Sequence, residues 1–226
     1  MLLGEEAVKK LHNSRVLLFG LGGVGSAAFE ALCRAGVGRL VIVDGDAVDI
    51  TNINRQIIAL TSTVGQRKTL AARNRGLDIN PEADIVCRDE FVTAESLDGF
   101  ELSGFDYVID AIDTVSVKLS LAERCQRLGV PLISAMGTGG KMHPELLRIG
   151  DIYETNSCPL ARVMRKELRH RKVEALKVVW SPEERAVADA PGFSKRGENP
   201  SPGTVSFVPP VAGYLMAGEV IRQIVG

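Results

Sequence analysis

Several features that mark special classes of protein are missing from this sequence. Its 27 basic and 28 acidic residues leave a formal charge of −1, which excludes a polybasic or polyacidic tail protein but leaves room for a local basic patch. The longest apolar stretch, residues 205–225, is interrupted by two prolines and two charged residues, Pro209, Pro210, Glu219 and Arg222. We therefore expect a buried C-terminal helix there and no membrane span.

Cysteine is also scarce. The four cysteines, Cys33, Cys87, Cys125 and Cys158, include no CxxC pair, so a four-cysteine zinc site is not expected. The first residues turn acidic at Glu5 before an apolar segment has formed, which is unlike a secretory leader. Both observations favour a reducing, cytoplasmic location. Cys158 adjoins a basic helix in a polar loop, and we expect a packed thiol there rather than an activated one.

Composition and patterning predict one α/β domain spanning residues 1–226. Hydrophobic residues make up 45% and charged residues 24%, as in soluble globular proteins. Strands are predicted at 15–19, 39–43, 84–87, 107–109 and 131–134, and helices at 4–13, from a glycine loop to about 35, at 66–78 and at 115–128. Continuous apolar strands alternating with helices indicate a doubly wound, Rossmann-like, mostly parallel sheet.

The C-terminal part, residues 141–226, is less regular. We expect strands at 146–153 and 175–180, and helices at 159–171 and 208–225. Between them, residues 181–204 hold four prolines and three glycines with few apolar side chains. This composition predicts a mobile loop, long enough that a function is favoured over mere connection. The domain thus divides into a core at 1–140 and a mixed extension at 141–226 on the substrate side.

A glycine-rich motif follows the first predicted strand and opens a helix. Residues 20–25 read Gly-Leu-Gly-Gly-Val-Gly, and Asp44 lies 19 residues after Gly25, at the end of the next strand. The spacing of Gly20, Gly22 and Gly25 suits a tight turn and a close approach of backbone amides to phosphate. A carboxylate at position 44 can accept hydrogen bonds from a ribose hydroxyl. The pattern predicts a nucleotide ligand, with a purely structural turn as the alternative.

The residues that follow Asp44 are unlike those of a dehydrogenase. The next polar turn and the start of the following helix carry amide and cationic side chains, Asn52, Arg55, Gln56 and Lys68. A triphosphate needs such neutralisation more than the pyrophosphate of a dinucleotide does. Asp110 and Asp113 follow the fourth strand, at the sheet edge where α/β proteins bind ligands, and a carboxylate there could hold Mg²⁺ against phosphate oxygens.

Together, GxGGxG, the strand-end Asp44, (S/T)NxxRQ, VGxxK and DxxD over residues 4–140 resemble the ubiquitin-activating-enzyme-like adenylyltransferases of the ThiF, MoeB and HesA type. The resemblance implies that ATP or its metal is contacted by Gly20, Gly22, Gly23, Gly25, Asp44, Thr51, Asn52, Arg55, Gln56, Lys68, Asp113 and Thr114. It further implies that Arg55 and Lys68 stabilise charge at the transferring phosphorus, and that Asp113 positions Mg²⁺ and the leaving pyrophosphate. Surface ion pairs for Arg55 and Lys68, and a loop cap for Asp113, are the alternatives.

The C-terminal third resembles one branch of that superfamily. Residues 137–144, Gly-Thr-Gly-Gly-Lys-Met-His-Pro, with 151–155 and the Cys-Pro-Leu-Ala-Arg run at 158–162, look like the tRNA threonylcarbamoyladenosine dehydratases. The resemblance implies an ATP-dependent ligase or cyclase that closes the threonylcarbamoyl group beside the anticodon through an acyl-adenylate. Ring closure within one side chain has a large effective molarity, so it requires no enzyme thiol. The sequence departs from the family at His143, where an acid is expected before the proline.

A tRNA substrate should leave an electrostatic footprint. Residues 159–171 concentrate basic side chains, and spacings of three and four place Arg162, Arg165, Lys166 and Arg169 on one helix face, which would suit backbone phosphates. Lys195 and Arg196 could close over bound RNA. The resemblance also implies a homodimer, a possible sulfur-transfer partner, and an N-terminal arginine that reaches a neighbouring subunit's ATP; here that arginine is absent or supplied by Arg15.

Three other functions remain alternatives. Adenylation of the C-terminus of a ubiquitin-like sulfur carrier is disfavoured by the missing zinc cysteines. An NAD-dependent oxidoreductase is disfavoured by Asn52, Arg55 and Lys68. A scaffold that binds nucleotide without catalysis is the third.

Overall fold

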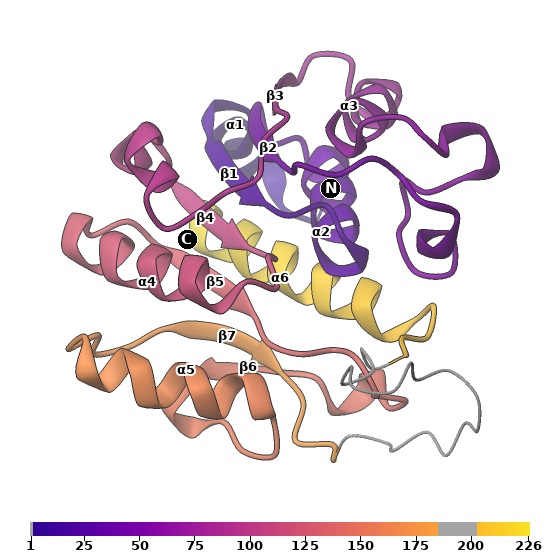
Figure 1. The fold of residues 1–226 in the computed structure, drawn as a ribbon. Helices are drawn as coiled ribbons and strands as arrows, with labels where there is room; N and C mark the ends of the chain where they lie inside the picture. Colours follow the sequence, from indigo (N-terminus) through magenta and orange to yellow (C-terminus); the bar gives the residue numbers. More distant parts are fainter. Residues whose placement is uncertain (1, 185–202) are drawn as a thin grey trace.

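A computed structural model describes residues 2–184 and 203–226. Most of the predicted loop at 181–204, including Lys195 and Arg196, lies outside the described residues. The fold is a seven-stranded sheet in the order β3-β2-β1-β4-β5-β7-β6 (Figure 1). The strands are β1 (Arg15–Phe19), β2 (Arg39–Val43), β3 (Asp84–Arg88), β4 (Tyr107–Asp110), β5 (Leu132–Ala135), β6 (Arg148–Asp151) and β7 (Lys177–Trp180). All neighbouring pairs are parallel except β6–β7, which confirms the mostly parallel sheet with a mixed C-terminal part.

Helices cover both faces of the sheet (Figure 1). They are α1 (Gly4–Asn13), α2 (Gly23–Ala35), α3 (Lys68–Ile79), α4 (Val115–Leu128), α5 (Pro159–His170) and α6 (Val208–Val225). Strand β1 shows why two layers are needed, because Val16 and Leu18 pack with α1, α2, α3 and α6, whereas Leu17 and Phe19 pack with α4 and α5. Successive side chains of a strand point to opposite faces of the sheet, and those of residues 16–19 are all apolar. Both faces of the sheet must therefore be covered.

The register of the central strands brings three loops to one edge. Phe19 pairs with Val43 on one side and with Asp110 on the other. The chain therefore leaves β1, β2 and β4 at the same level, into the glycine loop, the turn after Asp44 and the loop that carries Asp113. The strand order reverses between β1 and β4, and α/β sheets bind ligands at such a switch point.

In two of the predicted elements the boundaries differ from the observed ones, because hydrogen bonds to other segments hold the terminal residues. The helix predicted from residue 66 begins at Lys68, because the Gln66 carbonyl accepts the Val48 amide and Arg67 bridges to Ala47. The strand predicted at 146–153 is confined to β6, because Asp151 caps a short 3-10 turn through the Tyr153 amide. In the described part of the chain, no helix combines the length and apolar character needed to cross a membrane.

Candidate active site

A cleft of about 890 Å³ opens at the carboxyl edge of the sheet. Its walls come from the loops after β1, β2, β3, β4 and β5, and from residues just before and within α6. Ten of the predicted ligand-binding residues line it, namely Gly20, Gly22, Gly23, Asp44, Asn52, Arg55, Gln56, Lys68, Asp113 and Thr114. The structure thus brings together side chains that are far apart in the sequence. Gly25 and Thr51 are not part of the lining.

Close packing explains two of the glycines. Gly20 has a φ of 87°, and a Cβ there would lie 2.7 Å from the Ala111 carbonyl oxygen. A Cβ at Gly25 would lie 1.8 Å from the Gly20 carbonyl oxygen, so this residue supports the loop from behind. By contrast, the position above Gly22 is open, and Gly22 caps α2 with no side-chain hydrogen bond to its first amides. Those amides and the helix dipole are free to meet an anion.

Lys68 is held between two carboxylates at the centre of the cleft. Its Nζ lies 2.7 Å from Asp46 Oδ2 and 3.6 Å from Asp44 Oδ1, and the side chain is 7% exposed. Asp44 in turn accepts hydrogen bonds from the amides of Leu21 (2.7 Å) and Asp46 (2.8 Å). The carboxylate predicted to meet a ribose therefore also fixes the glycine loop. Asp46, which the sequence reasoning passed over, is the strongest ionic partner of Lys68.

Arg55 reaches the cleft from a turn that braces it. Its Nη1 donates to the Thr51 carbonyl at 2.8 Å and to Asn54 Oδ1 at 2.9 Å, while Asn54 Nδ2 donates to the Thr204 carbonyl at 2.9 Å. The Thr51 hydroxyl donates to Asp49 Oδ1 at 2.6 Å. Thr51 is not part of the cleft lining itself, but it shapes the turn through its contacts with Asp49 and Arg55, which are.

Gln56 presents an unpaired polar atom at this site. The residue is 5% exposed, and its Oε1 is buried with no hydrogen-bond partner among the described residues. An acceptor left unpaired in a protein interior is costly. Since Gln56 is part of the cleft lining, its amide group is a candidate for pairing with a bound ligand.

Asp110, the last residue of β4, and Asp113, in the loop that follows, lie in different environments. Asp110 is fully buried, where its Oδ2 accepts from Lys118 Nζ at 2.9 Å and from Ser134 Oγ at 2.6 Å. It is a structural anchor, so of the two acids considered for Mg²⁺, Asp113 is the one that lines the cleft. Asp113 is exposed in the cleft, and within the described residues no hydrogen bond or ion pair engages its carboxylate. Residues 2–184 and 203–226 hold no cluster of three or more His, Cys, Asp or Glu arranged to bind a metal.

The basic helix α5 runs from the cleft to the opposite edge of the sheet. Leu160 in its first turn lines the cleft. Arg162, Lys166 and Arg169 are exposed and Arg165 is half-buried. Arg165 donates to the Thr155 hydroxyl, and Arg169 lies over the Tyr153 ring, 5.1 Å from its centroid. Two of the four predicted RNA-binding side chains therefore also hold α5 against residues 153–155.

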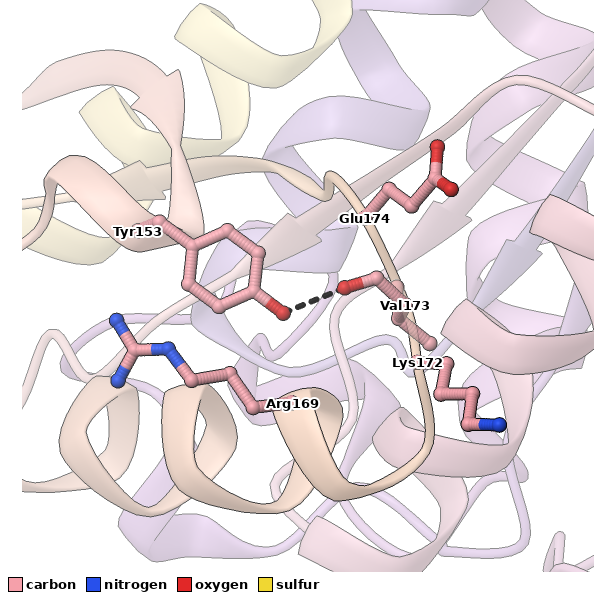
Figure 2. Close-up of a pocket in the computed structure, with 5 residues that line it drawn as sticks. All are labelled: Tyr153, Arg169, Lys172, Val173 and Glu174. Atoms are coloured by element: carbon pink, nitrogen blue, oxygen red, sulfur yellow. Dashed lines mark hydrogen bonds between the residues drawn. The ribbon is translucent and has the colours of Figure 1, made fainter.

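A smaller pocket of about 330 Å³ lies at the far end of α5 (Figure 2). Tyr153, Arg169, Lys172, Val173 and Glu174 line it, and the Tyr153 hydroxyl donates to the Val173 carbonyl at 2.5 Å. Burial raises the pKa of Tyr153. Figure 2 shows the Arg169 guanidinium beside the ring and the Lys172 ammonium pointing away from it. No catalytic groups converge in this pocket. Residues 172–174 of its lining lead into the amino end of β7, whereas the cleft lies at the carboxyl ends of the strands.

The remaining sequence candidates do not reach the cleft. Arg15 begins β1, at the strand end opposite to Gly20, so it cannot serve the cleft of its own chain. His143 is exposed and pairs with Glu145 at 2.8 Å. Cys158 is 3% exposed and packs in the core, which confirms the packed thiol. Burial raises the pKa of Cys33 and of Cys125 to about 12, so neither is a thiolate at neutral pH.

Sequence reasoning missed several residues that line the cleft. Among them are Gly45, Asp46, Phe91, Thr138 and Leu160. The Asp44-Gly45-Asp46 spacing could have indicated Asp46, because the two acids flank a glycine directly after a strand. Phe91 carried no comparable signal, because its loop follows an edge strand and matches none of the recognised motifs.

Comparisons with known proteins agree with this geometry. The sequence profile of the ThiF family matches residues 1–226. The chain is 41% identical to the tRNA threonylcarbamoyladenosine dehydratase of Bacillus subtilis over 98% of this chain and 91% of that protein, and 39% identical to the Escherichia coli protein of the same name over 74% and 63%. Crystal structures of the Escherichia coli dehydratase with AMP and with ATP share 32% and 31% identity, cover 99% of this chain and 90% of those chains, and superpose with a TM-score of 0.89.

Proposed function

This chain belongs to the ThiF family and, within it, to the tRNA threonylcarbamoyladenosine dehydratases, and from that premise we propose that it uses ATP to cyclise threonylcarbamoyladenosine beside the tRNA anticodon. The observation that carries the proposal is one cleft in which the N-terminus of α2, Lys68 and Asp113 converge, the last with no partner for its carboxylate within residues 2–184 and 203–226. The cationic side chains of Lys68 and Arg55 suit the charge of a triphosphate, whereas the pyrophosphate of a dinucleotide does not require them. We propose residues 1–140 as the nucleotide-binding core and 141–226 as the substrate side of the same domain.

The reaction divides into two steps. In the first, the threonyl carboxylate attacks the α-phosphorus of ATP, and the bond to the β-phosphate oxygen breaks, giving an acyl-adenylate and pyrophosphate. In the second, a ureido heteroatom of the same side chain attacks the acyl carbon, the ureido group loses a proton, and AMP leaves. Intramolecular attack supplies the proximity that a protein nucleophile would otherwise provide, which agrees with the buried state of Cys158.

Each cleft residue has a role in this scheme. The amides at the start of α2 bind phosphate oxygens, and Asp44 accepts from the ribose. Lys68 and Arg55 stabilise the charge that develops at the α-phosphorus, because fixed cations in a site shielded from water act without reorganisation. Lys68 meets the requirement for a fixed and shielded cation, because its side chain is 7% exposed and is held in place by Asp46.

Asp113 suits a magnesium ion that arrives with ATP. Mg²⁺ in phosphoryl-transfer sites is held by one or two carboxylates together with substrate phosphates, and Asp113 offers a carboxylate with no protein partner in the described part of the chain. Bound there, the ion would neutralise charge on the leaving pyrophosphate. We assign Mg²⁺ to ATP and Asp113 rather than to a metal cage built from protein groups alone.

The exposed cations of α5 supply a path for tRNA phosphates. The helix has 12 residues and spans about 18 Å at 1.5 Å per residue, from Leu160 in the cleft to the pocket of Figure 2. Arg162, Lys166 and Arg169 are exposed on it, but Arg169, like Arg165, already has an intramolecular partner. We therefore propose that Arg162 and Lys166 make the principal phosphate contacts, with Arg165 and Arg169 in support.

We also propose a cytoplasmic homodimer. The support for the dimer is that four apolar side chains of the loop between β2 and α3 are exposed, namely Ile50, Ile53, Leu60 and Val64, and a second copy of the chain would cover them if they form one patch. A sulfur-transfer partner stays a prediction.

Substrate dependence tests the proposal. The purified chain is incubated with ATP and either tRNA that carries threonylcarbamoyladenosine, the same tRNA without that modification, or a ubiquitin-like sulfur carrier. AMP formation with the modified tRNA alone is expected. AMP formation that requires the carrier protein would replace the proposal with the alternative adenylation reaction.

Two variant pairs test the assigned residues. Asp113→Ala should abolish exchange of pyrophosphate into ATP, whereas Asp78→Ala, which changes an exposed acid outside the cleft, should leave it intact. Arg162→Glu with Lys166→Glu should weaken tRNA binding and lower the slope of log affinity against log salt by about one for each phosphate that is no longer neutralised. Lys9→Glu with Arg73→Glu is the matched reversal on exposed residues elsewhere. Equal affinity of both double variants for tRNA would refute the role of α5.

A further inference from the structure

One aromatic side chain that lines the cleft belongs to neither hydrophobic cluster of the described residues. Phe91, in the loop that follows β3, is 72% exposed. Large apolar side chains at that exposure carry a hydration cost, and its neighbour Phe100 shows the usual arrangement, being buried and in edge contact with Phe19. Phe91 lines the cleft together with Glu90 and Val92.

The Phe91 ring packs against Gly45, and a larger residue at that position would collide with it. A Cβ at Gly45 would lie 2.5–2.8 Å from three carbons of the Phe91 ring. The ring therefore lies against the Gly45 backbone, directly after Asp44. The loop is anchored just before Phe91, where Arg88 stacks over Phe100 at 4.4 Å and pairs with Glu90 at 2.5 Å. These contacts hold the ring beside the cleft while most of its surface stays open.

The direction of a bound nucleotide follows from the strand order. Phosphates belong at the start of α2, after β1, and the ribose belongs at Asp44, after β2. The next strand on that side is β3, so continuing along the same line places the base at the loop after β3. Phe91 is part of that loop, and its ring packs against Gly45 in the turn after Asp44. A purine attached to the ribose would lie at this ring.

We propose that the adenine of ATP stacks on the Phe91 ring, which Gly45 supports from the other side; this proposal rests on the function proposed above. Aromatic side chains stack on any nucleobase, because every base has a π face. Phe91 would then set the affinity for ATP, while Lys68 and Asp113 act on the phosphates.

Removal of the ring provides the test. Phe91→Ala should weaken binding of ATP and of AMP by about 5- to 150-fold, the range for loss of one base–aromatic stack, and Phe91→Tyr should retain binding. The KM for ATP should rise while kcat at saturating ATP changes little. Inorganic tripolyphosphate, which has no base, should bind the wild type and Phe91→Ala equally. Leu128→Ala removes another exposed apolar side chain, away from the cleft, and should change the affinity for neither ATP nor tripolyphosphate.

A second variant keeps the proposal testable if Phe91→Ala alters the loop. Gly45→Ala should displace the ring and weaken ATP binding in the wild type, but should have a smaller effect when Phe91 is already alanine, because the two changes act on one contact. Unchanged ATP affinity in Phe91→Ala, or an equal loss of tripolyphosphate affinity, would overturn the proposal. A raised KM for tRNA alone would assign the ring to RNA. None of these outcomes affects the proposed function, which fails if the wild type forms no AMP.

Discussion

Replacement of Lys68 is the sharpest perturbation that the site offers. Lys68→Met keeps the length of the side chain and removes its charge. In the structure, Nζ bridges Asp46 at 2.7 Å and Asp44 at 3.6 Å, and both acids remain after the substitution. The variant therefore brings two uncompensated carboxylates next to the incoming triphosphate, and it also removes a cation from the reacting phosphorus.

The expected effects on catalysis and on folding differ in size. Loss of a preorganised group that stabilises transition-state charge lowers kcat by about 10²–10³-fold. The cost to stability is small, because the ion pair with Asp46 has a 54% exposed partner and such pairs contribute about 0–1 kcal/mol, while the more buried Asp44 keeps its hydrogen bonds from the Leu21 and Asp46 amides. For a chain of this size, 1 kcal/mol corresponds to a change in Tm of about 2–4 °C. Lys68→Met should therefore be folded and nearly inactive.

Single-turnover AMP formation with modified tRNA, measured beside the thermal unfolding curve, tests this reasoning. Arg67→Met is the matched control, since Arg67 precedes Lys68, pairs with Asp89 at 3.7 Å and does not line the cleft. A rate for Lys68→Met equal to that of Arg67→Met would refute the assigned role. Loss of activity explained by unfolding would refute the separation of catalysis from stability.

Three further substitutions have separate expected outcomes. Cys158→Ala should keep AMP formation at the wild-type order of magnitude; a folded but inactive variant would require a thiol intermediate. Lys118→Met leaves the buried Asp110 without its partner, and urea unfolding should show a loss of about 3–5 kcal/mol, whereas a loss below about 1 kcal/mol would show that the pair is hydrated. The hydrogen bond from Lys177 lowers the pKa of Glu219, so this carboxylate stabilises the fold above its unfolded pKa of about 4.3, and that contribution is lost as the pH falls through the lower folded pKa. Glu219→Gln should therefore be less stable than the wild type at neutral pH and equally stable at low pH; a difference that does not change with pH would contradict this.

Much of the fold was predictable because its signals are local. The continuous apolar run at 15–19 and the glycine loop fix a strand and a turn on their own, and helix α4 begins and ends as predicted, at Val115 and Leu128. The boundaries that were wrong depend on distant partners. Asp151 ends β6 by holding the amides of Tyr153 and Leu176, and no pattern within residues 146–153 reveals the second of these contacts.

The candidate site shows the same limit. Motif spacing identified ten residues that the fold gathers in one cleft, because those residues follow strands whose carboxyl ends must meet. It could not separate the buried Asp110 from the open Asp113, since a strand-end acid and a buried anchor look alike until Lys118 and Ser134 are seen beside it. It also missed Phe91, whose importance depends on its contact with Gly45, 46 residues earlier in the sequence.

The mass of the modified nucleoside after one turnover tests the central claim most directly. The wild-type chain, ATP, Mg²⁺ and tRNA that carries threonylcarbamoyladenosine are mixed, the tRNA is digested, and the nucleoside is weighed by mass spectrometry alongside AMP and pyrophosphate. The account predicts a nucleoside lighter by one water, formed in equal amount to AMP and pyrophosphate. AMP released while the nucleoside keeps its original mass would contradict it.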